Sequence, residues 1–294
     1  MNSIEEILND LKINLDKTDK QLIKDFENNG YCVIQKSNFV SKNLNEFRSL
    51  IDGLIKKESW RGGWEGKEEY MKYEKKFNSG ANRLANLFNK HDLFLKLLCE
   101  ENILKIVFGI LGNDFKIGGL DMREPLKGTG WQELHIDWLP KKNLNEPTQN
   151  IVGFIFLDDA HKENGSMRLV PKTHKKPGWI DDYQKDKSFH ADEIFVDVKE
   201  SSIVLMDANL WHSGTTNNNG NRRRVLYVDI RRRDIPQLLN QRIYLDEITQ
   251  EKLNDVEKYL LGLRNNDSIF EDRVFTVGNV YRKQFKTDVV VKQH

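Results

Sequence analysis

Two histidines and one aspartate in this sequence have the spacing of a metal site. His135 and Asp137 form a His-x-Asp tripeptide, and His212 follows Asp137 by 75 residues. Side chains two residues apart on a strand point to the same face, so His135 and Asp137 can converge on one ion. Two imidazoles and one carboxylate form the facial triad, which holds a non-haem Fe(II) and leaves coordination positions open. The sequence therefore predicts an oxygen-activating iron site at these three residues.

A second tripeptide, His190-Ala191-Asp192, has the same form. His212 follows it by only 20 residues, which is too close for the intervening strands of a jelly roll, and His294 is the last residue. The alternative interpretation of the first tripeptide is a half-buried histidine next to an aspartate that caps a turn. Spacing favours His135 and Asp137 over the second tripeptide as metal ligands.

Three consecutive arginines follow the second histidine. Arg223 lies eleven residues after His212, at the head of the apolar run 225–228. A buried arginine needs an anionic partner, because its charge cannot be removed by deprotonation. A dicarboxylate co-substrate could be that partner and be held by two parallel hydrogen bonds. The alternative is that Arg222, Arg223 and Arg224 form a solvated basic turn.

The elements that must position these residues are short strands. From residue 116 onward the sequence consists of brief apolar or alternating runs separated by turn residues. The predicted strands are 116–122, 150–157, 166–170, 193–198, 202–206 and 224–230. No helical pattern separates them, which favours an antiparallel sandwich or jelly roll over a parallel sheet.

Helical patterns flank this β region on both sides. Residues 1–115 are predicted to form a mainly helical layer that includes one short strand, Tyr31 to Ile34; one helix ends at Gly30 and another is opened by Ser41. Residues 60–80 lack periodicity and are predicted to be a lid or binding loop. Helical spacing returns after Pro236. We expect one domain, 1–294, with a jelly-roll core at 116–233 and a helical extension at 234–294.

Composition excludes several classes of function. The 294 residues carry 46 basic and 45 acidic side chains, so no global field draws the chain to nucleic acid or to an anionic membrane. With two cysteines, Cys32 and Cys99, we expect no disulfide framework, and the sequence predicts neither a signal peptide nor a membrane span. We expect a cytoplasmic protein, monomeric or homodimeric, with a small-molecule substrate.

The order of these motifs resembles the phytanoyl-CoA dioxygenase family of Fe(II)- and 2-oxoglutarate-dependent oxygenases. After the His-x-Asp tripeptide come residues 163–174, ENGSMRLVPKTH, then residues 211–214, WHSG, and then Arg223. The family has a similar segment between its ligands, although many members have Gly-Ser where this chain has Lys172-Thr173. Residues 26–34, FENNGYCVI, also resemble the family's usual opening. The resemblance covers roughly residues 20–232 and implies a double-stranded β-helix, the cupin-like jelly roll.

The resemblance also implies roles for individual residues. His135, Asp137 and His212 would bind Fe(II), and Arg223 would grip the distal carboxylate of 2-oxoglutarate. Ser213 and, more loosely, Arg83 would lie near this co-substrate, whereas His174 is expected to be structural. Dioxygen would be the second co-substrate, with succinate and CO2 as products. The carboxylate at Asp137 disfavours halogenation, because halogenases have a small residue there and bind halide in the freed position.

The substrate is predicted less sharply. Hydroxylation of an unactivated C–H bond in a small polar or anionic metabolite is the leading hypothesis. Side chains that could contact such a substrate are Arg123, Trp131, Trp138 and Arg231. Each could instead be structural, as a solvated or salt-bridged arginine or a core tryptophan.

Three other readings stay open at this point. The same chemistry could give desaturation or ring formation on a natural product or a carrier-bound group. A non-catalytic jelly-roll protein could bind a metal structurally, or none. A nucleic-acid binder built on the basic segments 222–224 and 231–233 is opposed by the near-neutral charge balance.

Overall fold

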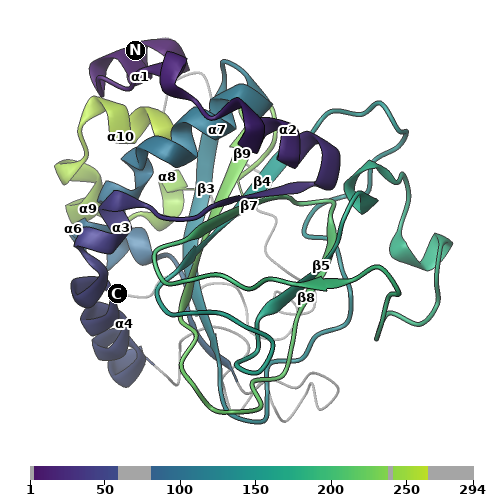
Figure 1. Ribbon diagram of the computed structural model, residues 1–294. Helices are drawn as coiled ribbons and strands as arrows, with labels where there is room; N and C mark the ends of the chain where they lie inside the picture. The colour runs from purple at the N-terminus through teal and green to yellow at the C-terminus, as the bar shows by residue number, and fades with distance from the viewer. Residues whose placement is uncertain (1–2, 59–80, 238–240, 264–294) are drawn as a thin grey trace.

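The computed structural model describes residues 3–58, 81–237 and 241–263 (Figure 1). Two antiparallel sheets form its centre, one with the strand order β1-β7-β4-β9-β3-β2 and the other with the order β6-β5-β8. The strands are β1 (Tyr31–Ile34), β2 (Ala81–Leu84), β3 (Phe115–Pro125), β4 (Asn150–Phe156), β5 (Met167–Val170), β6 (Ile194–Phe195), β7 (Ile203–Asp207), β8 (Trp211–Gly214) and β9 (Val225–Arg232). Each of the six strands predicted from residue 116 onward coincides with an observed strand.

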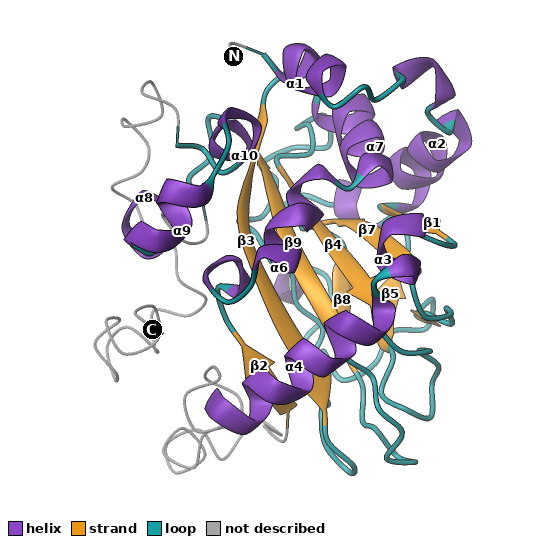
Figure 2. Cartoon of the chain, turned by 90° about the vertical axis from the view of Figure 1, so that its left-hand side faces the viewer, coloured by secondary structure: helices purple, strands orange, loops and turns teal. Residues whose placement is uncertain are grey.

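Helices cover the outer face of the six-stranded sheet, and the three-stranded sheet lies on its other side (Figure 2). They are α1 (Ile4–Asp10), α2 (Lys20–Asn29), α3 (Asn38–Lys42), α4 (Leu44–Glu58), α6 (Asp92–Lys96), α7 (Glu101–Leu111), α8 (Gln241–Tyr244), α9 (Glu247–Lys252) and α10 (Asp255–Leu260). Five 3-10 turns add Leu15–Lys17, Leu87–Asn89, Leu97–Cys99, Thr173–Lys175 and Ile180–Asp182. No helix in the described ranges is long and apolar enough to cross a membrane. The loop predicted at 60–80 lies outside the described residues.

One helix boundary differs from the prediction. Ser41 lies inside α3 and opens no helix; Ser37 caps α3 instead, because its Oγ accepts a hydrogen bond from the Val40 backbone N–H at 3.2 Å. The Ser37 hydroxyl also donates to the buried Glu100 carboxylate, which caps α7. The pattern of apolar residues therefore located the helices, but it did not show which of two serines has a tertiary partner.

Alternation along the strands produces two separate cores. On β9, Leu226, Val228 and Ile230 face the helices. Val225 and Tyr227 face the interior between the sheets, where they pack with Leu169 of the small sheet. Residues of β9 with odd numbers therefore point into the barrel, and this rule fixes which polar side chains can reach an interior site.

Gly30 and His174 close the junction between α2 and the sheets. Gly30 ends α2 in the left-handed conformation, with φ of 85°. A Cβ at this position would lie 2.6 Å from His174 Nδ1, so the imidazole packs directly on the glycine backbone. His174 is buried, and its Nε2 donates to the Glu27 carbonyl at 3.2 Å. Burial lowers the pKa of His174 to about 4, against an opposing effect of Asp207. His174 thus lies apart from the three predicted ligands and has structural contacts.

His174 should make stability depend on pH. Below about pH 6.5 the unfolded chain protonates this histidine, while the folded protein resists until about pH 4. The free energy of unfolding should therefore fall as the pH drops through this window, by at most about 3 kcal/mol. His174→Gln should flatten the slope in urea titrations at several pH values, whereas His161→Gln should leave it unchanged. An unchanged slope in His174→Gln would contradict a neutral buried imidazole.

Candidate metal centre

Pairing with β8 brings the predicted ligands together. His135 and His212 form an isolated antiparallel bridge, with reciprocal backbone hydrogen bonds of 2.9 and 3.1 Å. Two residues later the Asp137 backbone N–H donates to the Ala208 carbonyl at 2.8 Å. The shared face of His135 and Asp137 was predicted from the side-chain alternation of a strand, whereas the structure has an isolated bridge at His135 and no longer strand there. The bridge is sufficient to fix both side chains opposite His212.

The three side chains converge on one point. Their ligand atoms all lie within 4.8 Å of one another. Asp137 Oδ2 is 3.3 Å from His212 Nε2, and Asp137 Oδ1 is 3.7 Å from His135 Nε2. In the described residues this is the one group of histidine, cysteine or acidic side chains with the geometry to hold a metal ion.

Backbone carbonyls orient both imidazoles. His135 Nδ1 lies 2.8 Å from the Glu133 carbonyl, and His212 Nδ1 lies 2.9 Å from the Leu210 carbonyl. Each Nδ1 must carry the proton to donate to a carbonyl, which leaves Nε2 with a free lone pair aimed at the centre. In both cases the carbonyl belongs to the residue two positions before the histidine. A sequence motif alone does not show such a backbone contact.

Electrostatics favour the ligand forms of His135 and Asp137. Burial, aided by His212, lowers the pKa of His135 to about 4, so its imidazole is neutral near pH 7. Burial opposes ionisation of Asp137, but His212 and His135 outweigh it and hold the pKa of this carboxyl below its usual value. The pKa of His212 is raised by Asp137 against the effect of burial. A carboxylate between two imidazoles matches the donor set that Fe(II) prefers.

Arg223 is the most deeply buried of the three consecutive arginines. It is 2 % exposed and shares the interior face with Val225 and Tyr227. Its Nε has no hydrogen-bond partner among the described residues, and burial lowers its pKa to about 10. Arg222 is exposed and forms ion pairs with Asp52 and the buried Glu124. Arg224 is buried and forms ion pairs with Asp52 and Asp158. The solvated-turn alternative therefore describes Arg222 but neither Arg223 nor Arg224.

Ser213 points away from this interior. It neighbours His212 on β8, so its side chain lies on the opposite face, where Ser213 Oγ is 2.5 Å from Arg168 Nε. Arg168 also donates to the Gln132 and Ser188 carbonyls and pairs with Glu193. The sequence analysis missed this buried arginine, which ties β8 to the segment before His135. This orientation contradicts the predicted contact of Ser213 with the co-substrate.

Arg83 and Arg123 lie beside the ligands. They are paired across β2 and β3. The charge of Arg83 lowers the pKa of Asp137, and the charge of Arg123 lowers the pKa of His135. Arg123 also donates to the Gly130 carbonyl at 3.0 Å. A Cβ on Gly214 would lie 2.8 Å from Arg123 Nη1, so the glycine after Ser213 lets this guanidinium approach β8.

Of the residues predicted to contact the substrate, Arg231 is buried, whereas Trp138 and Trp131 are partly exposed. Arg231 is 1 % exposed, its Nε donates to Asp229 at 2.7 Å, and its guanidinium stacks 4.4 Å above the Trp138 ring. It also donates to the Pro236 carbonyl at 2.6 Å. These partners already satisfy its charge, which argues against the predicted contact of Arg231 with an anionic substrate. Trp138 and Trp131 are partly exposed near the ligands.

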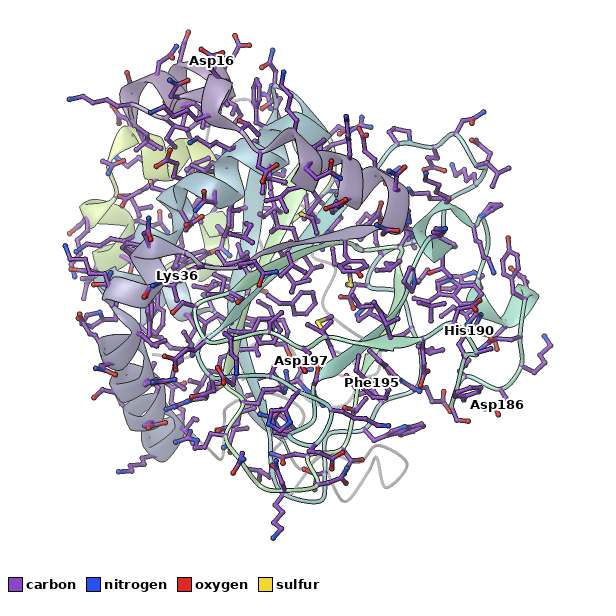
Figure 3. The ribbon with its side chains drawn as sticks, in the orientation of Figure 1. Asp16, Lys36, Asp186, His190, Phe195 and Asp197 are labelled. Atoms are coloured by element: carbon purple, nitrogen blue, oxygen red, sulfur yellow. The ribbon has the colours of Figure 1, made fainter. Side chains whose placement is uncertain are left out.

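The second His-x-Asp tripeptide is structural. His190 Nδ1 accepts a hydrogen bond from the Asp192 backbone N–H, and its ring stands edge-on to Trp211. Figure 3 shows His190 at the margin of the molecule, in the loop beyond β5 and β8. The spacing argument against this tripeptide is consistent with its position.

Comparison with known proteins adds a family to this geometry. The sequence model of the phytanoyl-CoA dioxygenase family (PhyH) matches residues 26–225. The chain belongs to this family. Membership of the phytanoyl-CoA dioxygenases brings Fe(II) as the metal, with 2-oxoglutarate and dioxygen as co-substrates. No match was found among curated proteins.

Solved structures show the same fold. HygX from Streptomyces hygroscopicus, with nickel and 2-oxoglutarate bound, has a TM-score of 0.59 at 14% identity, over 74% of this chain and 89% of that chain. The carbocyclase SnoK from nogalamycin biosynthesis has a TM-score of 0.57 at 19% identity, over 75% and 86%. The epimerase SnoN from the same biosynthesis has a TM-score of 0.57 at 14% identity, over 73% and 83%. The prediction of a jelly-roll core with flanking helices is confirmed.

Proposed function

We propose that this phytanoyl-CoA dioxygenase family member hydroxylates an unactivated C–H bond of a small polar metabolite, releasing succinate and CO2. His135, Asp137 and His212 would hold Fe(II), and Arg223 would bind the distal carboxylate of 2-oxoglutarate. The observation that carries the proposal is the buried Arg223, which faces the interior between the sheets that His212 also faces, with an Nε that no described residue accepts from. A buried guanidinium costs free energy unless an anion joins it.

The protein's own contribution is position and charge. The Glu133 and Leu210 carbonyls hold the two imidazoles with Nε2 inward, and Asp137 supplies the negative charge between them. Iron and 2-oxoglutarate, when bound, supply the oxidising power for C–H cleavage. Arg83 and Arg123 add positive charge beside the ligands, which suits a co-substrate with two carboxylates. Asp137 fills the position that halide would need, so we propose hydroxylation rather than halogenation.

Two alternatives differ in outcome. Desaturation or ring formation on a natural product or a carrier-bound group uses the same site, and the related folds include a carbocyclase and an epimerase. A small free substrate is supported by HygX with hygromycin B and SnoN with nogalamycin RO bound. A non-catalytic jelly roll would have no use for a buried arginine whose Nε no described residue accepts from. Both cysteines are free thiols, which suits the cytoplasmic location that we propose.

The first experiment is anaerobic addition of Fe(II) and 2-oxoglutarate to the full chain. The expected result is the weak visible charge-transfer band of the chelate, followed in air by succinate release in a metabolite panel. Product analysis by mass then separates hydroxylation, which adds one oxygen, from desaturation and ring formation, which add none. No band under saturating conditions would reject the oxygenase assignment.

A further inference from the structure

The turn between β7 and β8 contacts the chain that follows the metal ligand Asp137. Residues 207–210 form a β-turn, in which the Leu210 backbone N–H donates to the Asp207 carbonyl at 2.8 Å. Asp207 Oδ1 accepts from the Asn209 backbone N–H at 2.8 Å. This local bond is common for an aspartate in the first position of a turn. It leaves the second carboxylate oxygen, Oδ2, for other partners.

That second oxygen binds a distant part of the chain. Asp207 is fully buried, and its Oδ2 accepts from Lys141 Nζ at 3.2 Å and from Thr148 Oγ1 at 2.7 Å. Lys141 is 7 % exposed, so the two side chains form a buried ion pair. Both partners belong to the loop 138–149, which begins directly after Asp137. One buried carboxylate therefore holds both ends of this loop.

The chain after the metal ligand contacts the same turn at every second residue. The Asp137 backbone N–H donates to the Ala208 carbonyl at 2.8 Å. Two residues later the Leu139 carbonyl accepts from Asn209 Nδ2 at 2.8 Å. Two residues further along, Lys141 forms the buried ion pair. The segment 137–141 is therefore fixed by consecutive residues of one turn.

Strand pairing does not perform this task. Among the described residues, pairing of the segment ends at the His135–His212 bridge. His135 is fixed by that bridge, whereas the position of Asp137 depends on the contacts of its own backbone and of the chain behind it. The turn also leads into β8, where the Leu210 carbonyl orients the His212 imidazole. It thus adjoins two of the three predicted ligands.

An ion pair that only stabilises the fold is the alternative, and the protein offers one for comparison. Lys90 Nζ lies 2.6 Å from Glu58 Oε2, and the two side chains are 5 % and 9 % exposed. This pair joins the end of α4 to the chain after β2, and neither segment carries a predicted metal ligand. In both pairs, loss of the lysine leaves a buried carboxylate without its cation, which is destabilising.

We propose that Asp207 and Asn209 are positioning residues for the metal ligand Asp137, acting through Lys141 and the Leu139 carbonyl. The proposal rests on the proposed function and deepens it, because it adds the residues that place one ligand of the proposed iron site. Groups that orient metal ligands typically change metal affinity by about 10- to 100-fold. A loss of this size, separate from any loss of stability, is what distinguishes positioning from a purely structural role.

Lys141→Met and Lys90→Met form a matched pair of variants. Each removes one lysine from a buried ion pair, so each should lower the urea concentration at which the metal-free full chain unfolds. Calorimetric titration with Ni(II) in the absence of urea then measures metal affinity. Only Lys141→Met should bind Ni(II) more weakly, by about tenfold or more. Equal Ni(II) affinity in both variants and in the unchanged protein would overturn the proposal.

Asn209→Ala tests the same contact without a charge change, and it keeps the test decisive if Lys141→Met does not fold. It removes the amide that donates to the Leu139 carbonyl, so Ni(II) affinity should fall about tenfold. Asn43→Ala is its control, because Asn43 Nδ2 also donates to a backbone carbonyl, that of Phe39, at 2.8 Å. Unchanged Ni(II) affinity in Asn209→Ala would contradict the proposal.

The visible absorption of bound Co(II) gives a second readout, since it reports the geometry of the ligands. It should differ from that of the unchanged protein in Lys141→Met and Asn209→Ala, and it should be the same in Lys90→Met and Asn43→Ala. A Co(II) spectrum that is identical in all five proteins would show that the turn does not position Asp137.

The unchanged protein separates this proposal from the proposed function. Ni(II) binding that Lys141→Met and Asn209→Ala weaken, in a protein that forms no charge-transfer band with Fe(II) and 2-oxoglutarate, rejects the oxygenase assignment while the positioning role stands. A band in the unchanged protein, with full Ni(II) affinity in both variants, rejects the positioning role alone. An unchanged protein that binds neither Ni(II) nor Fe(II) rejects both.

Discussion

His212→Ala is expected to abolish both the anaerobic charge-transfer band and substrate-dependent succinate release. His212 is buried on β8, its Nδ1 is fixed by the Leu210 carbonyl, and its Nε2 lies 3.3 Å from Asp137. No other histidine of the described residues joins the group, so nothing replaces the missing ligand. Metal affinity should fall at least about 100-fold, the upper end of losses seen when only the partner of a ligand is removed.

His190→Ala is the matched control for this prediction. It removes the histidine of the other His-x-Asp tripeptide, whose contacts are the Asp192 backbone and the Trp211 ring. The band and succinate release should both persist, with at most a modest loss of thermal stability. Retention of the band in His212→Ala, or its loss in His190→Ala, would show that the wrong tripeptide had been chosen. Thermal shift with Ni(II) gives an independent readout of metal binding in both variants.

Most of the fold follows from local pattern. Periodicity placed β1 at its observed bounds and located every described strand from β3 onward except β8, since buried strands need apolar runs of the right length. β2 (Ala81–Leu84) was missed, because its sequence ANRL has no apolar alternation and its partner is β3, far along the chain. Features that depend on a distant partner, such as the choice of Ser37 over Ser41 as a helix cap, cannot be predicted from the local sequence pattern.

The candidate site divides in the same way. Spacing and strand alternation selected His135, Asp137, His212 and the inward direction of Arg223. Alternation also predicted that Arg231 points inward. The sequence could not show that its guanidinium forms an ion pair with Asp229 and stacks on Trp138. Ser213 was expected near the co-substrate from the motif. It directly follows His212 on β8, so its side chain lies on the opposite face and contacts Arg168. Direction is therefore predictable from sequence, whereas the partner of a polar group is not.

Arg223→Met is expected to weaken 2-oxoglutarate binding while leaving metal binding intact. Removing one partner of a buried, hydrogen-bonded charge pair costs about 2–5 kcal/mol, which is roughly thirtyfold or more in affinity. Titration of 2-oxoglutarate into the Fe(II)-loaded protein, followed by the charge-transfer band, measures the change. The band at saturation should keep its intensity, because the keto-acid end of the co-substrate is not held by Arg223 in this assignment.

The same substitution should raise the stability of the protein without 2-oxoglutarate. Arg223 there is a buried charge with an Nε that no described residue satisfies, and its lowered pKa reflects the cost of that burial. An apolar side chain of similar length removes this cost, since replacing a buried charge by a hydrophobic residue is often neutral or stabilising. Arg222→Met is the control: it removes an exposed guanidinium that pairs with Glu124 and Asp52, and it should leave 2-oxoglutarate affinity unchanged. Higher stability together with lost co-substrate affinity identifies a residue kept for binding. Lower stability with unchanged affinity would make Arg223 a structural residue and leave the 2-oxoglutarate carboxylate without a partner.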